Sequence, residues 1–181
     1  MVDPQLVRSF NSRQLSLVSG AGRVVVFAVL GGRHAGPSLQ VHIPTAALLL
    51  ERLPDHIDTV VFIDEPVPDA ALVSLIDDMV AEHAGLGVDV VANFVPAVEA
   101  VKRIDGDRVR EGIDRSRLVS VRPPEVLSRH AMQRAINSIE AGLWVNPAAL
   151  VSAAGGSLTL YSGSHAAPPA TTPRSVDPRS G

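Results

Sequence analysis

The 181-residue sequence contains no cysteine, which excludes disulfide bonds and thiolate-ligated metal sites. Aromatic residues make up only 3% of the chain while hydrophobic residues make up 46%, so a core must be built from aliphatic side chains. Long apolar runs are lacking too. The longest, residues 24–30, is far shorter than the roughly 20 residues that a membrane helix needs. With no secretory signal visible either, we expect a cytoplasmic protein with no membrane partner.

Basic residues are fewer than acidic ones, and all but one of them are arginine. The chain has 16 Lys and Arg against 19 Asp and Glu, for a net charge of −3, and its single lysine is Lys102. This balance gives no reason to expect nucleic acid as a partner. The six histidines show none of the close spacings of a zinc site, so we expect no zinc.

Apolar runs of strand length alternate with amphipathic helical patterns along the chain. Buried strands are expected at residues 24–30, 59–63, 88–95 and 157–161, and helices at about 46–53, 69–84 and 124–143. In the second helix Asp69 is the expected N-cap, and in the first it is Thr45. This alternation predicts an α/β fold, a three-layer sandwich around a mainly parallel sheet.

The remaining segments divide the chain into three parts. Residues 1–23 are polar and are expected to form a loosely ordered lead-in, and residues 164–181 have the composition of a disordered tail. Between them, residues 24–163 form the α/β domain. Within it, two alternating segments flank Asp105 and Gly106 and predict a hairpin in an arm at about residues 100–122. Residues 102–122 contain seven basic and four acidic residues, a net charge of +3 in an acidic protein.

Two places in the sequence have residues suited to phosphate chemistry. Gly31, Gly32 and Arg33 follow the first strand, where a glycine loop can bring backbone N–H groups to a phosphate. No helix pattern starts directly after them, so a simple loop is the other interpretation. Asp64 ends the second strand, at the edge where open α/β sheets bind ligands, and can hold Mg²⁺ there. It can equally serve as a local acceptor for loop N–H groups.

Several motifs between residues 59 and 163 resemble the family of 2-C-methyl-D-erythritol 4-phosphate cytidylyltransferases, enzymes of non-mevalonate isoprenoid biosynthesis. Residues 95–103 (VPAVEAVKR) are similar to its P-V-x-D-T-[IVM]-K-R motif, and residues 108–118 (RVREGIDRSRL) to V-x-x-T-V-D-R-x-x-L. Residues 59–68 (TVVFIDEPVP) resemble a strand that ends in an HDAARP-type segment. Residues 122–125 (RPPE) replace the usual T-P-Q, and residues 146–163 are similar to the family's last conserved stretch.

The resemblance implies a Rossmann-like nucleotidyltransferase sandwich with a projecting β-arm, and a homodimer. It further implies CTP and a sugar-alcohol phosphate as ligands, with Mg²⁺ as cofactor. By the same resemblance Asp64 is the metal ligand, while the nucleotide contact of Gly31, Gly32 and Arg33 is expected from their position after the first strand. Lys102 and Arg115 are the catalytic candidates, and Arg115 matches the arm arginine that reaches the partner subunit's substrate.

The departures from the family bear on activity. Its glycine-loop lysine and its C-terminal lysine are both missing, and Ala100 stands where the family has a threonine that contacts the sugar phosphate. The part before residue 59 is also short for the family's nucleotide-binding half. We therefore expect a degenerate cytidylyltransferase-like protein, a pseudoenzyme with weak or no activity. The alternatives are a working enzyme in which Arg33 substitutes for the lost lysine, and a non-catalytic dimeric binding or regulatory module.

Overall fold

The computed structural model describes residues 15–29, 39–64, 68–97, 101–139 and 144–161. Their centre is a six-stranded sheet with the strand order β1-β2-β4-β8-β5-β10. The strands are β1 Leu15–Ala21, β2 Val24–Val29, β4 Thr59–Ile63, β8 Val119–Ser128, β5 Val90–Pro96 and β10 Leu158–Leu160. Pairing is parallel for β2 with β4 and for β5 with β10, whereas β8 runs antiparallel to both β4 and β5. Hence β2, β4, β5 and β10 all point the same way, as the sequence predicted.

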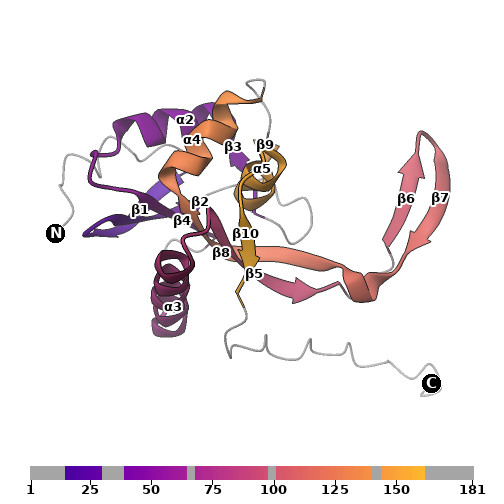
Figure 1. The fold of residues 1–181 in the computed structure, drawn as a ribbon, viewed down its shortest axis with the longest axis horizontal. Helices are drawn as coiled ribbons and strands as arrows, with labels where there is room; N and C mark the ends of the chain where they lie inside the picture. Colours follow the sequence, from indigo (N-terminus) through magenta and orange to yellow (C-terminus); the bar gives the residue numbers. More distant parts are fainter. Residues whose placement is uncertain (1–14, 30–38, 65–67, 98–100, 140–143, 162–181) are drawn as a thin grey trace, which may run out of the picture.

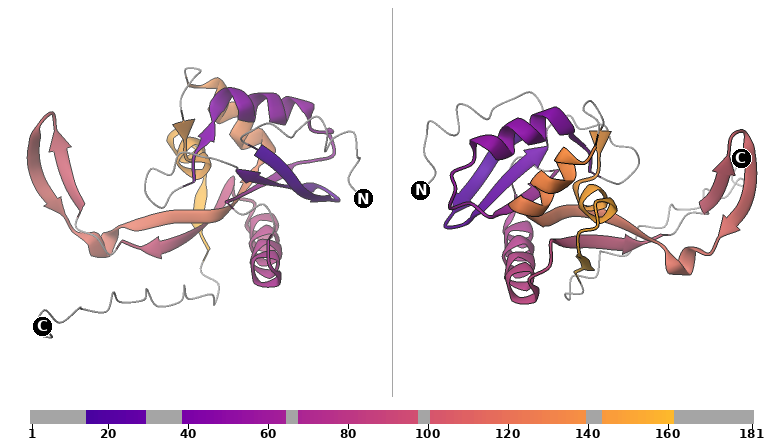
Figure 2. Two further views of the ribbon diagram at one scale, coloured as in Figure 1. Left: turned by 180° about the vertical axis from the view of Figure 1, so that it is seen from behind. Right: turned by 45° about the horizontal axis from the view of Figure 1, so that its top comes forward.

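Helices cover both faces of this sheet (Figures 1 and 2). The helices are α2 Ile43–Arg52, α3 Ala70–Leu86, α4 Arg129–Asn137 and α5 Pro147–Ala153. On one face α3 packs Ile76 and Met79 against alternate residues of β2, β4, β5 and β8. The other face is covered by α2, α4 and α5, together with the small sheet of β3 Val41–His42 and β9 Trp144–Val145. None of the described helices is long and apolar enough to cross a bilayer.

The continuous apolar runs form strands because both of their faces are covered. All five residues of β4 are buried, and so are five of the six in β2. Successive side chains of a strand point to opposite faces, so a strand between two helix layers needs an apolar residue at every position. This physical requirement made β2 and β4 visible in the sequence.

The best-predicted helix is α3. The side chain of Asp69 accepts a hydrogen bond from the backbone N–H of Leu72, which confirms the expected N-cap. At the other end Gly87 has a left-handed backbone (φ +62°), and its N–H donates to the carbonyl of His83. A residue with a side chain adopts that conformation at a cost, so glycine is the favoured helix terminator here.

Three expectations about local structure were wrong. Residues 15–21 of the predicted lead-in form strand β1, which pairs antiparallel with β2. Helix α2 begins at Ile43 with Pro44 in its first turn, so Thr45 is not the N-cap. The helix expected over residues 124–143 begins only at Arg129, because residues 119–128 are strand β8; it ends at Asn137, and residues 140–143 lie outside the described residues. Apolar residues at i+4 spacing suggested one long helix, whereas the side chain of Ser128 caps the helix at its real start.

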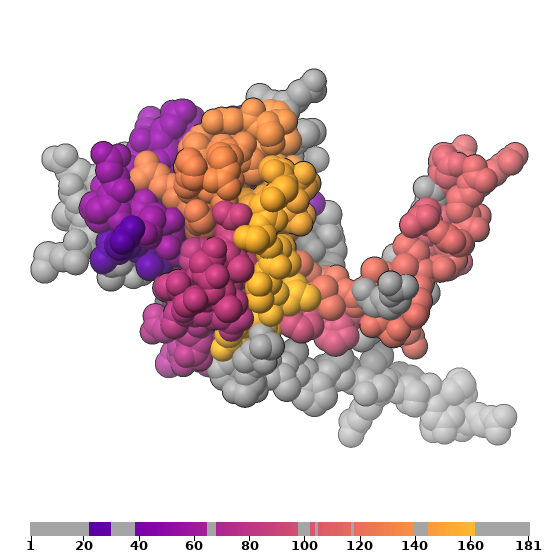
Figure 3. Space-filling model, in the orientation of Figure 1, coloured from indigo at the N-terminus to yellow at the C-terminus, as the bar shows by residue number. Residues whose placement is uncertain are grey.

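The predicted arm is present as a separate two-stranded ribbon, β6 Val101–Asp105 and β7 Arg108–Ile113, followed by a single 3₁₀ turn at Arg115–Arg117. Asp105 pairs with Arg108, which makes Gly106 and Asp107 the turn, and Gly106 has a φ of +58°. The space-filling view shows the ribbon standing away from the body (Figure 3). The tail predicted at residues 164–181 lies outside the described residues.

Candidate functional site

The carboxyl ends of β2, β4 and β5 meet at one edge of the sheet, which is the ligand-binding edge of open α/β folds. Asp64 follows the last residue of β4 and is exposed there, as the sequence predicted. Strand β2 leads toward Gly31, Gly32 and Arg33, but these three residues lie outside the described residues.

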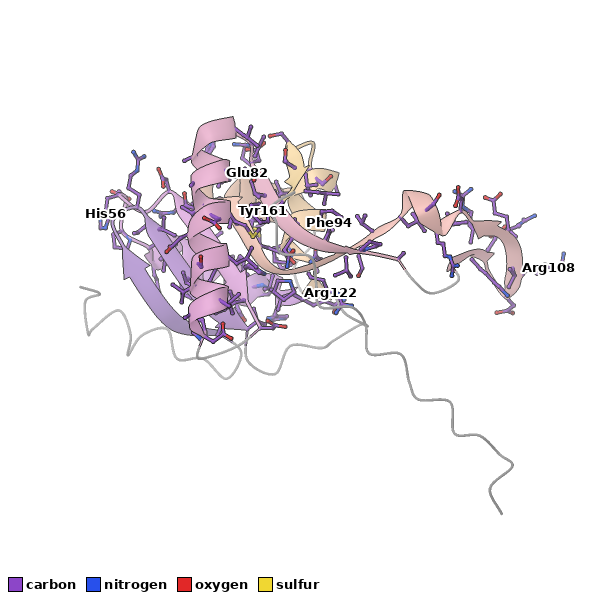
Figure 4. The ribbon with its side chains drawn as sticks, turned by 90° about the horizontal axis from the view of Figure 1, so that it is seen from below. His56, Glu82, Phe94, Arg108, Arg122 and Tyr161 are labelled. Atoms are coloured by element: carbon purple, nitrogen blue, oxygen red, sulfur yellow. The ribbon has the colours of Figure 1, made fainter. Side chains whose placement is uncertain are left out.

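Strand β8 brings Arg122 to the same edge. Arg122 pairs with Asn93 of β5, next to a register shift in the ladder. The side-chain amide of Asn93 donates to the carbonyl of Pro123 at 3.1 Å, which fixes the strand beside Arg122. In Figure 4 Arg122 lies in the body of the molecule, whereas Arg108 lies far out on the arm.

The guanidinium of Arg122 is half-buried, and its Nε has no hydrogen-bond partner in the described part of the chain. No ion pair joins this guanidinium to a carboxylate of the described residues either. A buried charged donor without a partner is costly, and a bound anion removes that cost. Guanidinium groups suit phosphate because they donate two parallel N–H bonds to it.

A fully buried carboxyl lies three residues further along β8. Glu125 accepts a hydrogen bond from the side-chain amide of Asn146 at 2.5 Å and from the backbone N–H of Ala148 at 2.9 Å. Burial raises the pKa of Glu125 to about 7, although both hydrogen bonds oppose this rise. The same amide of Asn146 donates to the carbonyl of Leu39. Glu125 therefore connects the sheet to the start of α5 and to the chain before β3.

Within one chain the predicted catalytic residues do not meet Asp64. Lys102 is exposed at the start of β6, and Arg115 is exposed in the turn after β7. Both belong to the arm, which leaves the body in all views (Figures 1 and 2). A site that contains Asp64 and Arg115 together needs the arm of a second chain.

The described residues contain no cluster of three or more His, Asp or Glu side chains able to hold a metal ion by themselves. Asp64 alone can bind only a cation whose other ligands are water molecules or atoms of a bound ligand. Mg²⁺ bound to a nucleotide is such a cation, since it commonly keeps water and phosphate oxygens and takes one or two carboxylates from the protein.

Arg122, Glu125 and Asn146 were not recognised as part of the site from the sequence. The dipeptide Asn146-Pro147 is a helix-start signal, and Asn146 does cap α5 by accepting from Ala149. The burial of Glu125 had no such signal, because it depends on the insertion of β8 between two strands distant in the chain.

No protein-family model matches the sequence, and no curated protein is significantly similar to it. Solved structures do match in fold. The 4-diphosphocytidyl-2C-methyl-D-erythritol synthase of Anaerococcus prevotii aligns with 67% of this chain and 56% of its own, with a TM-score of 0.53 and 14% identity. The 2-C-methyl-D-erythritol 4-phosphate cytidylyltransferase of Francisella tularensis aligns with 65% and 57%, with a TM-score of 0.51 and 12% identity.

The fold is therefore the α/β nucleotidyltransferase fold. Within that class it is similar to the 2-C-methyl-D-erythritol 4-phosphate cytidylyltransferases, which confirms at the level of the fold the resemblance seen in the motifs. At these identities the likeness concerns the fold alone. The matched part of the chain spans a little over half the length of those two structures, 56% and 57%.

Proposed function

We propose that this protein binds a phosphate-bearing ligand of the CTP or sugar-alcohol phosphate class at the carboxyl edge of its sheet, with weak or no nucleotidyl transfer. The observation that carries the proposal is Arg122, whose Nε is buried without a hydrogen-bond partner and which forms no ion pair in the described part of the chain. It supplies a positive charge at the edge where the fold binds ligands.

The expected loss of activity follows from the distribution of cations. Transfer of a nucleotidyl group depends on positioning and on neutralising the charge that develops on the phosphates. The only lysine, Lys102, lies on the arm, and the glycine-loop and C-terminal lysines of the related family are absent from the chain. One arginine holds an anion in place, but several cations are needed to stabilise the transition state.

Asp64 would hold Mg²⁺ in this scheme, and the metal would supply further neutralisation of phosphate charge. The carboxylate is exposed and is a single ligand, so we expect Mg²⁺ to bind together with the nucleotide rather than before it.

The proposed site also involves a second chain, because the arm is expected to mediate a dimer. Apart from the half-buried Ile113, every residue of β7 is exposed, including the apolar Val109 at 58%. A lone ribbon is marginally stable, and a twofold partner is the most common surface for such an element. We propose a homodimer in which the arm of one chain brings Arg115 toward Asp64 of the other. The alternative function, a non-catalytic dimeric binding module, has the same dimer but no nucleotidyl transfer.

A pyrophosphate-release assay with CTP, Mg²⁺ and methylerythritol phosphate tests the catalytic part. We expect release barely above the rate without protein. Turnover at a rate ordinary for enzymes, on the order of one per second or faster, would show instead a working cytidylyltransferase with a rearranged site.

A further inference from the structure

The face of the sheet that α3 covers carries a row of side chains at the carboxyl edge. Asn93 of β5 lies two residues after Val91, which packs under α3, so both side chains point to that face. Arg122 pairs directly with Asn93 across the ladder, and residues that are directly opposed share a face. The side chain of Arg122 is therefore on the α3 side of the sheet.

Tyr161 extends this row on the other side of Asn93. Its backbone N–H donates to the carbonyl of Ala92 at 2.9 Å, which continues the parallel ladder in which Leu160 lies beside Ala92. The side chain of Tyr161 packs against the apolar cluster under α3. Neighbouring strands are about 5 Å apart, so the backbones of Tyr161 and Arg122 are separated by about 10 Å.

The ring of Tyr161 is suited to stacking. Tyr161 is half-buried, because it packs against the cluster under α3 and stays partly exposed among the described residues. Such a ring is held in place by the core and offers a flat surface on which a nucleobase can stack. Figure 4 shows Tyr161 and Arg122 on the same side of α3, toward the arm.

The charge changes sign along the row. Asp78 and Glu82, one turn apart on α3, form no ion pair with any described residue. Loss of water around the phenol raises the pKa of Tyr161, and the negative charges of Asp78 and Glu82 raise it further, so these carboxylates lie near the ring. At the other end Nε of Arg122 lacks a partner in the described part of the chain. An anionic ligand on this row therefore has its phosphate at Arg122 and its uncharged end at Tyr161.

We propose that Tyr161 stacks with the base of a nucleotide whose phosphate group Arg122 binds. This inference rests on the proposed function and narrows its ligand to a nucleoside phosphate, because a sugar-alcohol phosphate has no planar ring to stack on the tyrosine. A nucleotide has the required polarity, with an uncharged base at one end and its phosphates at the other. Tyr161 is then the residue that selects the nucleotide among phosphate compounds.

The test is a calorimetric titration of the full chain with CTP and with inorganic triphosphate, each in the presence of Mg²⁺. Triphosphate can bind Arg122 but has no base, so it separates the phosphate contact from the stacking contact. We expect Tyr161→Leu, which removes the ring, to weaken CTP binding about fivefold or more and to leave triphosphate binding unchanged. Tyr161→Phe is the matched control, which keeps the ring and should bind both ligands as the wild type does.

A second measurement needs no variant. Tyr161 is the only tyrosine of the chain, so tyrosine labelled with ¹³C in its ring gives NMR signals of this side chain alone. The ring current of a stacked base should shift these signals when CTP is added, and triphosphate should shift them much less.

The inference is overturned if Tyr161→Leu affects CTP and triphosphate alike, or if CTP leaves the tyrosine signals unshifted. Weaker CTP binding by Arg122→Gln in that case still supports the phosphate site, so the proposed function stands without the stacked base. If neither CTP nor triphosphate binds the wild type saturably, the proposed function fails and this inference fails with it.

Discussion

The buried carboxyl of Glu125 makes the stability of the protein depend on pH. Its pKa is about 7 in the folded chain, against an ordinary value of 4.5. The unfolded chain therefore releases this proton at a lower pH than the folded chain does. The stability that comes from the neutral carboxyl is fully present below pH 4.5 and is lost as the pH rises to about 7.

Glu125→Gln provides the comparison, since an amide does not titrate and other titrating groups cancel in the difference. Relative to this variant, the wild type should lose on the order of 3 kcal/mol of unfolding free energy between pH 4.5 and 7. Urea unfolding of both proteins at several pH values measures this difference. A difference that stays constant with pH would contradict a buried, titrating Glu125.

Among the elements, α2 and α4 share the core cluster and are also linked by one charged side chain. The guanidinium of Arg129 donates to four backbone carbonyls at or just after the end of α2, those of Leu50, Leu53, Pro54 and Ile57, at 2.8 to 3.2 Å. A cation at a helix C-terminus also interacts favourably with the helix dipole. Without it, these partly buried carbonyls lose their donor.

We expect Arg129→Met to lower the free energy of unfolding by about 2 to 4 kcal/mol, since charged hydrogen bonds contribute more than neutral ones. Arg134→Met, in the same helix, is the control. Its side chain is 53% exposed and makes only a 3.4 Å contact with Asp89, so its loss should cost less than about 1 kcal/mol. Equal effects of the two substitutions would mean that the contacts of Arg129 do not stabilise the junction.

The arm is the element that determines the expected assembly. Two of its arginines are paired within the ribbon: Arg103 contacts Glu111 at 2.8 Å, and Arg110 pairs with Asp105. Replacement of residues 103–112 by a short Gly-Ser loop should convert a dimer into a monomer in light scattering. The body should keep its melting temperature, because the ribbon forms a sheet of its own. A wild type that is monomeric at micromolar concentration would rule out the shared site.

Across the whole molecule, the sequence predicted features that depend on local pattern. The strands β2, β4 and β5, the helix α3 with its Asp69 cap, and the hairpin each have a signal within a dozen residues. Strand β8 has none, because its place between β4 and β5 depends on contacts between distant segments. For that reason Asp64 could be placed from the sequence, while the roles of Arg122 and Glu125 became visible only in the fold.

The central claim is that the fold has kept a phosphate site while losing the cations needed for catalysis. Titration of CTP with Mg²⁺ into the wild type, Arg122→Gln and Arg134→Gln tests it most directly. Both substitutions remove one positive charge, but Arg134 lies on α4 beside Asp89, at the opposite edge of the sheet. Thermal unfolding should show all three proteins folded, since Arg122 is half-buried and its Nε makes no hydrogen bond that Arg122→Gln would remove.

We predict saturable binding to the wild type, about tenfold weaker binding to Arg122→Gln, and unchanged binding to Arg134→Gln, as expected for one lost charged contact to phosphate. No saturable binding to the wild type, or equal affinities for all three proteins, would contradict a phosphate site at Arg122.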